Sequence, residues 1–154
     1  MLAVLCTDSE LAEEGEVLSV GDQVARLAVT ATPDFYGTDL DRIEWVLDRY
    51  AQIASGGRRI AEISGTIASI HAIYIALSLD PTGWAPAAGT ATLERLETTT
   101  ATRRPERRIA WGPTVAMDAQ GRATRAGYPV LEEGDEHFSG WVITLAEERV
   151  RLMD

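Results

Sequence analysis

Four arginines gathered in one short segment are the residues of this sequence best suited to binding a ligand. They are Arg103, Arg104, Arg107 and Arg108, and they form two overlapping Arg-x-x-x-Arg spacings. A guanidinium group is planar, keeps its charge and donates parallel hydrogen bonds to a phosphate. The segment therefore predicts a phosphate or nucleotide site. The competing interpretation is a surface segment whose positive charges meet the acidic surface elsewhere on the protein.

The arginine spacings resemble those of PilZ domains, in which such arginines clamp the phosphates and guanines of cyclic dinucleotides. That family also carries an Asp/Asn-x-Ser-x-x-Gly strand soon after the arginines. In this sequence Asp118-Ala119-Gln120-Gly121 follows and does not supply that strand. The resemblance implies a nucleotide ligand, but only the arginines of this sequence support it, because the second motif of the family is missing.

The remaining polar side chains do not have the spacing of a catalytic centre or a metal site. Cys6 is the sole cysteine and His71 is one of two histidines, and a nucleophilic pair would need them adjacent, with an orienting acid. The surroundings of Cys6 favour a buried small hydrophobic residue instead. His137 follows an acidic stretch, but the alternating oxygen ligands of a calcium loop are missing there. We therefore expect no catalytic residue, no metal and no cofactor.

The four tryptophans divide into two classes by their surroundings. Trp45 and Trp141 lie in periodic apolar segments and are predicted to belong to the core. Trp84 and Trp111 lie near glycine and proline, as in loops. Exposed loop tryptophans are frequent anchors of protein interfaces, so these two are the candidate interface residues. Alternatively, the loops fold down and the two side chains cap the domain.

Composition narrows the classes of partner. The chain has 154 residues and a net charge of −10, and all of its basic residues are arginines. Nonspecific binding of nucleic acid requires cations that neutralise phosphates, so we expect no nucleic-acid partner. The acidic charge suits docking to a basic protein.

Length and apolar content predict one soluble domain over residues 1–154, because a chain of this size buries a sizeable core. A single cysteine excludes an intrachain disulfide, which fits the cytoplasm. The longest uncharged run, residues 63–79, is too short and too polar for a membrane span, and no basic segment of a signal peptide precedes the apolar N-terminus. We expect a cytoplasmic protein that has no membrane partner.

The uncharged run of residues 63–79 must lie at the centre of the fold, and its pattern fits two structures. As a helix it would carry an apolar seam from Ile60 to Leu77. Its many β-branched residues and the internal Ser64-Gly65-Thr66 favour a strand. Strand alternation places on one face the larger apolar residues and one histidine: Ile63, Ile67, His71, Ile73, Ile75, Leu77 and Leu79.

The flanking segments predict a helix and further strands. After Thr38, a candidate N-cap, residues 39–54 carry apolar side chains at helical spacing. Strands are predicted at residues 24–30, 90–100 and 138–146, with a possible hairpin around residues 118–121.

The expected fold class is mostly β: a small barrel or curved antiparallel sheet of roughly six strands. One helix at about 39–54 would pack over an end or edge of it. The alternative is an α+β fold with a helical hairpin over residues 39–79.

Four blocks of sequence resemble, in order, a family of small uncharacterised actinobacterial proteins known as a domain of unknown function. They are LSVGDQV (18–24), ISGTIASIHAIY (63–74), APAAGTATLERLE (85–97) and FSGWVITLAEE (138–148). The family tends to carry paired early cysteines and a Glu-Glu-His-His stretch, where this chain has only Cys6 and Ser55-Gly56-Gly57. The resemblance implies a strand at 63–79 and carries no activity.

The function is predicted from three features together: the acidic charge, the loop tryptophans and the lack of a catalytic pattern. We expect a non-enzymatic interaction module that binds a protein partner or itself. A neutralising, immunity-type role is one specific version of this hypothesis. The alternative is a small-ligand or nucleotide-binding domain that uses the cluster from Arg103 to Arg108.

Overall fold

The computed structural model describes residues 1–32, 39–87, 91–103, 109–117, 119–121, 123–129 and 132–153. For residues 109–117 and 123–129 the description is confined to the backbone. Within these ranges no helix has both the length and the apolar character needed to cross a membrane.

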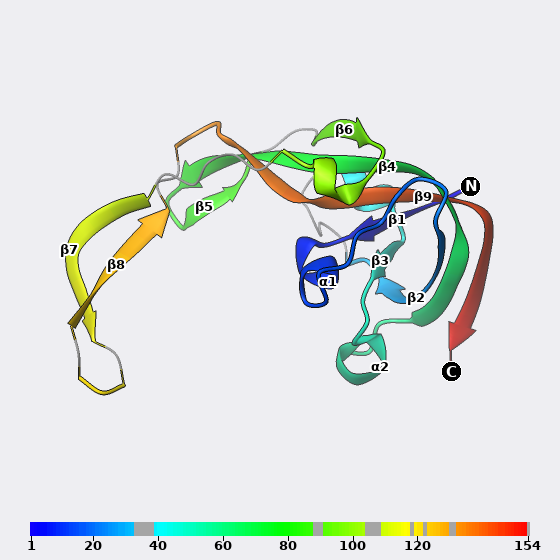
Figure 1. Cartoon of the computed structure of the whole chain (residues 1–154), viewed down its shortest axis with the longest axis horizontal. Coiled ribbons are helices and arrows are strands. Elements are labelled where there is room, and N and C mark those ends of the chain that lie inside the picture. Colours follow the sequence, from blue (N-terminus) through cyan, green and yellow to red (C-terminus); the bar gives the residue numbers. More distant parts are fainter. Residues whose placement is uncertain are drawn as a thin grey trace.

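One mixed sheet of seven strands forms the body of the protein (Figure 1). The strand order is β2-β3-β1-β9-β4-β5, β6 also pairs with β4, and β2 pairs with β4 as well as with β3. The sheet therefore curls back on itself, and the prediction of a mostly β fold is confirmed. The strands are β1 (Leu2–Cys6), β2 (Gln23–Thr30), β3 (Trp45–Leu47), β4 (Ile60–Asp80), β5 (Gly83–Pro86), β6 (Thr92–Leu96) and β9 (Glu136–Met153).

Two long antiparallel strands, β4 and β9, run through the whole sheet (Figure 1). Their pairing extends from Ile60 opposite Met153 to Ala76 opposite Glu136. The second edge of β4 pairs first with β2 and then with β6. A strand flanked on both edges and covered on both faces is apolar at most positions, which explains the uncharged run. The strand predictions for residues 63–79 and 138–146 are confirmed.

The prediction that the large side chains of residues 63–79 share one face is wrong. The register of β4 against β9 shifts between Ile67 and Ser69. Such a bulge inserts an extra residue and exchanges the two faces of the strand beyond it. Ile63 and Ile67 consequently pack in one core cluster, whereas Ile73 and Ile75 pack in another.

The two core clusters lie on opposite faces of the curled sheet. The first cluster includes Val4, Cys6, Trp45, Ile63, Ile67, Ile70, Tyr74, Trp141, Ile143 and Leu145. The second includes Leu5, Val29, Leu40, Val46, Ala51, Ile73, Ile75 and Val142. The prediction that Trp45 and Trp141 belong to the core is confirmed, with both less than 5% exposed.

The predicted helix at 39–54 is wrong. A 3₁₀ turn η1 (Asp39–Arg42), strand β3 and a short helix α2 (Ala51–Ala54) occupy that segment. All three residues of β3 are apolar, because the strand is buried on both of its faces. Consecutive apolar residues of this kind also fit the apolar face of a helix, so the sequence pattern did not distinguish the two structures. Since β3 pairs parallel with β1, the sheet is mixed and not antiparallel as predicted. The α+β alternative is wrong too, because residues 60–80 form a strand.

Short helical elements lie in the connections between the strands. Helix α1 (Asp8–Ala12) follows β1, and a second 3₁₀ turn, η2 (Thr99–Ala101), follows β6. At η2 the hydroxyl of Thr98 accepts a hydrogen bond from the backbone N–H of Thr100, and the hydroxyl of Thr99 accepts one from the backbone N–H of Leu18. The bond from Leu18 connects the segment before β2 to the turn that follows β6.

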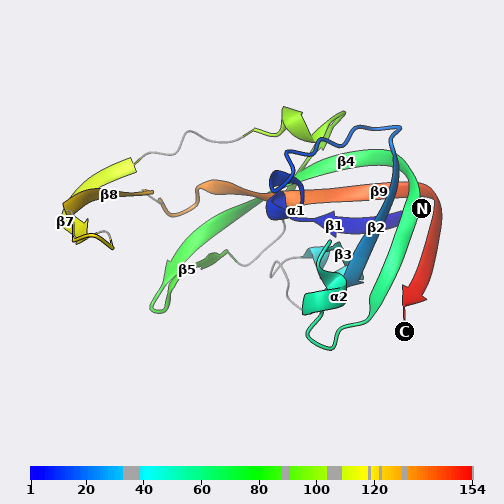
Figure 2. The same ribbon diagram turned by 60° about the horizontal axis from the view of Figure 1, so that its bottom comes forward.

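The C-terminal end of β4 and strand β5 leave the body as a hairpin, which we call the arm (residues 75–87). Figures 1 and 2 both show the arm extending away from α1, β1 and β3. Beyond it, β7 (Ile109–Met117) and β8 (Ala123–Pro129) form a separate two-stranded sheet. Among the described strands, these two pair only with each other. The hairpin predicted around residues 118–121 is confirmed.

Candidate functional site

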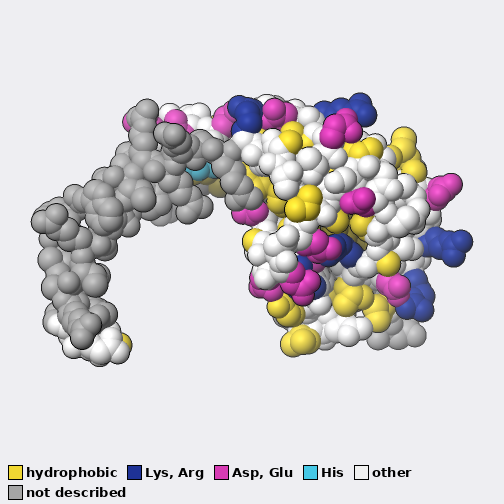
Figure 3. All heavy atoms as spheres, in the orientation of Figure 1, with side chains coloured by type: hydrophobic (Ala, Val, Ile, Leu, Met, Phe, Trp, Pro, Cys, Tyr) yellow, Lys and Arg dark blue, Asp and Glu magenta, His cyan; other side chains and the backbone are white. Residues whose placement is uncertain are grey.

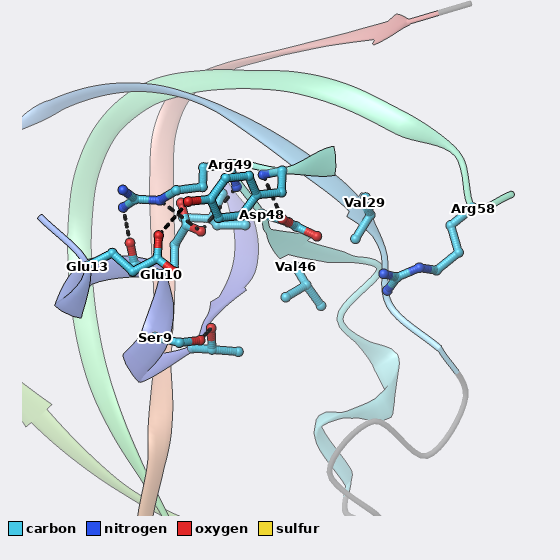
Figure 4. A pocket seen from close by; sticks show the side chains of 11 residues that line it. Ser9, Glu10, Glu13, Val29, Val46, Asp48, Arg49 and Arg58 are labelled. Carbon is cyan, nitrogen blue, oxygen red and sulfur yellow. Dashed lines mark hydrogen bonds and ion pairs between the residues drawn. The ribbon is translucent and has the colours of Figure 1, made fainter. Parts of the chain in front are cut away.

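A pocket of about 210 Å³ opens beside α1 on the body (Figure 4). Val29 and Val46 supply apolar lining, and Arg58 lies across the pocket from Glu10, Glu13 and Arg49. Its lining combines side chains from α1, the end of β2, β3 and the turns around α2: Thr7, Ser9, Glu10, Glu13, Val29, Val46, Leu47, Asp48, Arg49, Tyr50 and Arg58.

Glu10 is the one buried acid among the described residues, with a side chain 5% exposed. Its Oε2 accepts a hydrogen bond of 3.1 Å from the backbone N–H of Arg49 and lies 3.6 Å from Arg49 Nε. Its Oε1 lies 3.7 Å from Nη1 of Arg26, on β2. The Arg49 guanidinium also donates to the backbone oxygen of Glu10. Two cations thus compensate the buried carboxylate.

Further carboxylates surround the same two guanidinium groups. Arg26 also pairs with Glu16, and Arg49 lies 3.2 Å from Glu14. In Figure 3 acidic and arginine side chains lie side by side over this part of the body. We call Glu10, Glu14, Glu16, Arg26 and Arg49 the ion cluster. It joins α1 to β2 and to the end of β3, so its charges serve the packing of these elements.

The other polar groups of the pocket also have partners. The hydroxyl of Tyr50 donates a hydrogen bond of 2.6 Å to Glu13, which raises the pKa of Tyr50 above its usual value. Asp48 accepts from the backbone N–H of Tyr50, and Arg58 Nε donates to the backbone oxygen of Ser55. No group of three or more His, Cys, Asp or Glu side chains in the described part of the chain has the geometry of a metal site. The pocket has the character of a polar seam between elements.

Cys6 and His71 do not form a nucleophilic pair. Burial, and next the charge of Glu10, raises the pKa of the Cys6 thiol to about 12, so the thiol is protonated at neutral pH. On β9, Trp141 is opposite Cys6 and Val142 is opposite His71. Since consecutive residues of a strand point to opposite faces, the two side chains lie on different sides of the sheet.

The structure describes one of the four predicted ligand-binding arginines. Arg103 Nε donates a hydrogen bond of 2.7 Å to Glu94, which lowers the pKa of that carboxyl. Its guanidinium also lies 4.7 Å from the ring centroid of Tyr74, a cation–π contact. The guanidinium of Arg103 therefore already has two partners within the protein, the carboxylate of Glu94 and the ring of Tyr74. Arg104, Arg107 and Arg108 lie outside the described residues.

Of the two predicted interface tryptophans, Trp84 lies on strand β5 and not in a loop. Its side chain is 38% exposed and is opposite Leu79 on β4, which is 59% exposed. Trp111 lies on β7, where only the backbone is described. The loop predicted around residue 84 is therefore wrong, and the role of Trp84 as an interface residue stays a prediction.

The arm has one apolar face. Its register places Leu77 opposite Pro86 and Leu79 opposite Trp84, so these four side chains project from the same side. Sequence alternation assigned Leu79 to a buried face, because it does not show where the sheet ends. The Asp80-Pro81-Thr82-Gly83 turn was the available signal, since a tight turn after Leu79 must bring Trp84 opposite it.

The turn at the tip of the arm is held by its own side chains. Asp80 Oδ1 accepts hydrogen bonds of 2.7 Å from the backbone N–H of Thr82 and 2.6 Å from its hydroxyl. These bonds lower the pKa of Asp80, which therefore remains a carboxylate over a wide pH range. Gly83 has φ +126°, a backbone conformation that residues other than glycine rarely adopt. The apolar face is thus presented on a preorganised hairpin.

Comparison of the chain with protein-family models, with curated proteins and with solved structures gave no match. The resemblance to an actinobacterial family therefore stays a prediction, and function has to be argued from the geometry of the arm and the body.

Proposed function

We propose that this protein is a non-enzymatic interaction module that binds a protein partner through the arm. The observation that carries the proposal is the apolar face formed by Leu77, Leu79, Trp84 and Pro86 on a projecting hairpin. Docking would remove these side chains from water, which gains roughly 25 cal/mol per Å² of apolar surface. A tryptophan on a rigid strand loses little conformational entropy on binding, which makes Trp84 the anchor.

The strands β7 and β8 support an interaction role. A two-stranded hairpin alone is marginally stable in water. Among the described strands this hairpin has no further pairing partner. A protein that packs against it would supply the missing layer, and Trp111 belongs to the same proposal as a second anchor.

The chemistry of the body fits a binding role better than a catalytic one. The buried thiol is protonated, and the buried acid is compensated by two arginines. Such groups maintain the fold and leave no activated nucleophile or general base at the pocket.

Affinity isolation from cells of the source organism tests the proposal. The tagged wild-type protein should retain a stoichiometric protein partner, and the double variant Leu79→Ser/Trp84→Ala should lose it, because truncation of an interface anchor costs about 2 kcal/mol or more. The matched control is Ile53→Ser, since Ile53 is 86% exposed on the body. Equal recovery of the partner by the arm variant, or no stoichiometric partner for the wild-type protein, would refute the proposal.

Nucleotide binding by the arginine cluster is the competing function, and the pairing of Arg103 with Glu94 argues against it. A thermal-denaturation screen with mono- and cyclic dinucleotides separates the two functions. A ligand present at about 100 times its dissociation constant would add about 2.7 kcal/mol to the stability of a true binder. We expect an unchanged melting temperature across the panel.

A further inference from the structure

The charge around the arm identifies the class of partner that the apolar face would accept. Residues 75–87 and 132–137 contain five carboxylate side chains and no lysine or arginine. They are Asp80, Glu132, Glu133, Asp135 and Glu136.

We call residues 132–137 the acidic segment. Main-chain hydrogen bonds hold this segment against the arm. The N–H of Gly134 donates to the backbone oxygen of Leu77 at 2.9 Å, and the N–H of Leu77 donates to Asp135 at 3.2 Å. The acidic segment therefore lies along the edge of β4 opposite to β5. Asp80 lies at the tip of the same hairpin. Negative charge thus flanks the apolar face at one side and at the tip.

Addition of a partner strand to the edge of β5 is disfavoured. Pro86 has no N–H to donate, and proline on an edge strand is a usual obstacle to strand pairing. β5 is also only four residues long. Contact through the side chains of the apolar face is the mode of binding that this hairpin permits.

A second copy of the chain is a poor occupant of the face. Two copies would each bring a net charge of −10 and the same five carboxylates to the contact. Like charges brought together at an interface cost free energy, whereas lysine and arginine side chains beside these carboxylates would gain it.

We propose that the arm binds a basic protein surface, in which an apolar side chain packs on Leu79 and Trp84 and flanking cations meet Asp80, Glu133 and Asp135. The inference rests on the proposed function, because it names the partner class of the same arm. Basic charge accelerates association, and the apolar contact sets the lifetime of the complex.

Selection of peptides from a random phage-displayed library on the full-length protein tests the inference. Enriched peptides should combine an aromatic or aliphatic residue with flanking lysine or arginine. Their affinity should fall about fivefold in Glu133→Gln/Asp135→Asn, because exposed ion pairs contribute modestly. It should stay unchanged in the matched control Glu97→Gln/Glu147→Gln, which removes two exposed acids from the body. Raising the salt concentration from about 0.05 M to about 0.5 M should weaken binding as well.

Three results would overturn the inference. Enriched peptides that need Trp84 but carry no positive charge would refute the basic partner and leave the arm as a binding site. A lack of any peptide whose binding depends on Leu79 or Trp84 would refute the proposed function itself. A dimer in sedimentation equilibrium that Leu79→Ser/Trp84→Ala abolishes would assign the face to a second copy of the chain.

Discussion

Burial of the Cys6 thiol makes protein stability sensitive to alkaline pH. The pKa is raised from 9.0 to about 12 in the folded state, so above pH 9 the unfolded chain releases this proton while the folded protein retains it. The stability contribution is complete below pH 9 and is lost as pH rises toward 12. We expect the free energy of unfolding in urea to fall by roughly 1 kcal/mol per pH unit in this window.

Cys6→Ala is the control, because it removes the titrating group and should flatten this part of the pH profile. Iodoacetamide provides an independent measurement. The folded wild-type protein should react slowly at pH 8, and urea should make the thiol reactive, since thiolate and not thiol is the nucleophile. Rapid alkylation of the folded protein would contradict the assignment of Cys6 to the core.

At Gly65 the backbone of β9 leaves no room for a side chain on β4. A Cβ atom at this position would lie 2.8 Å from the carbonyl oxygen of Ala146 and 3.3 Å from Cα of Glu148. Gly65→Ala should therefore destabilise the protein by about 1–3 kcal/mol, measured by urea unfolding. Ser64→Ala, at the neighbouring half-buried position, should change stability by less than about 0.5 kcal/mol. Equal stability of the two variants would show that the strands can separate there without cost.

At the scale of elements, the ion cluster holds α1 in place, because the five-residue helix is too short to be stable alone. Glu10→Gln leaves Arg26 and Arg49 nearly buried without their central carboxylate. We expect a loss of about 3 kcal/mol in the free energy of unfolding, as for other buried pairs with one partner removed. Glu44→Gln removes one partner of the exposed Arg59–Glu44 pair and should cost less than about 0.5 kcal/mol.

Sequence reasoning located the elements whose signals are local. The β-branched run at 63–79 and the alternation at 138–146 predicted the two longest strands. It failed at β3, whose parallel pairing with β1 is a long-range contact that overrides helical spacing. It also failed at Glu10, since nothing in the run of acids near the N-terminus shows which one will meet two arginines. The assignment of side chains to the two faces of β4 also failed. A bulge exchanges the faces beyond Ile67, and its position depends on the pairing with β9, which the sequence of β4 does not show.

At the scale of the whole molecule, the β7–β8 hairpin should be dispensable for folding of the body. Its described strands pair with no strand of the seven-stranded sheet. Replacing residues 109–129 by two glycines should leave the melting temperature within about 2 °C of the wild type, because among the described strands no backbone pairing with the seven-stranded sheet is removed. The same deletion should weaken partner binding if Trp111 is an anchor. A loss of cooperative unfolding would show instead that the hairpin contributes to the core.

The central position of β9 has a consequence for synthesis. This late strand lies between β1 and β4, and pairs Leu145 with Leu2 and Met153 with Ile60. A nascent chain emerging from the ribosome therefore holds β1 and β4 without the strand that joins them. Their unpaired edges invite pairing with other chains. We expect the sheet to close only after β9 has emerged, so premature termination before residue 136 should yield an aggregating fragment.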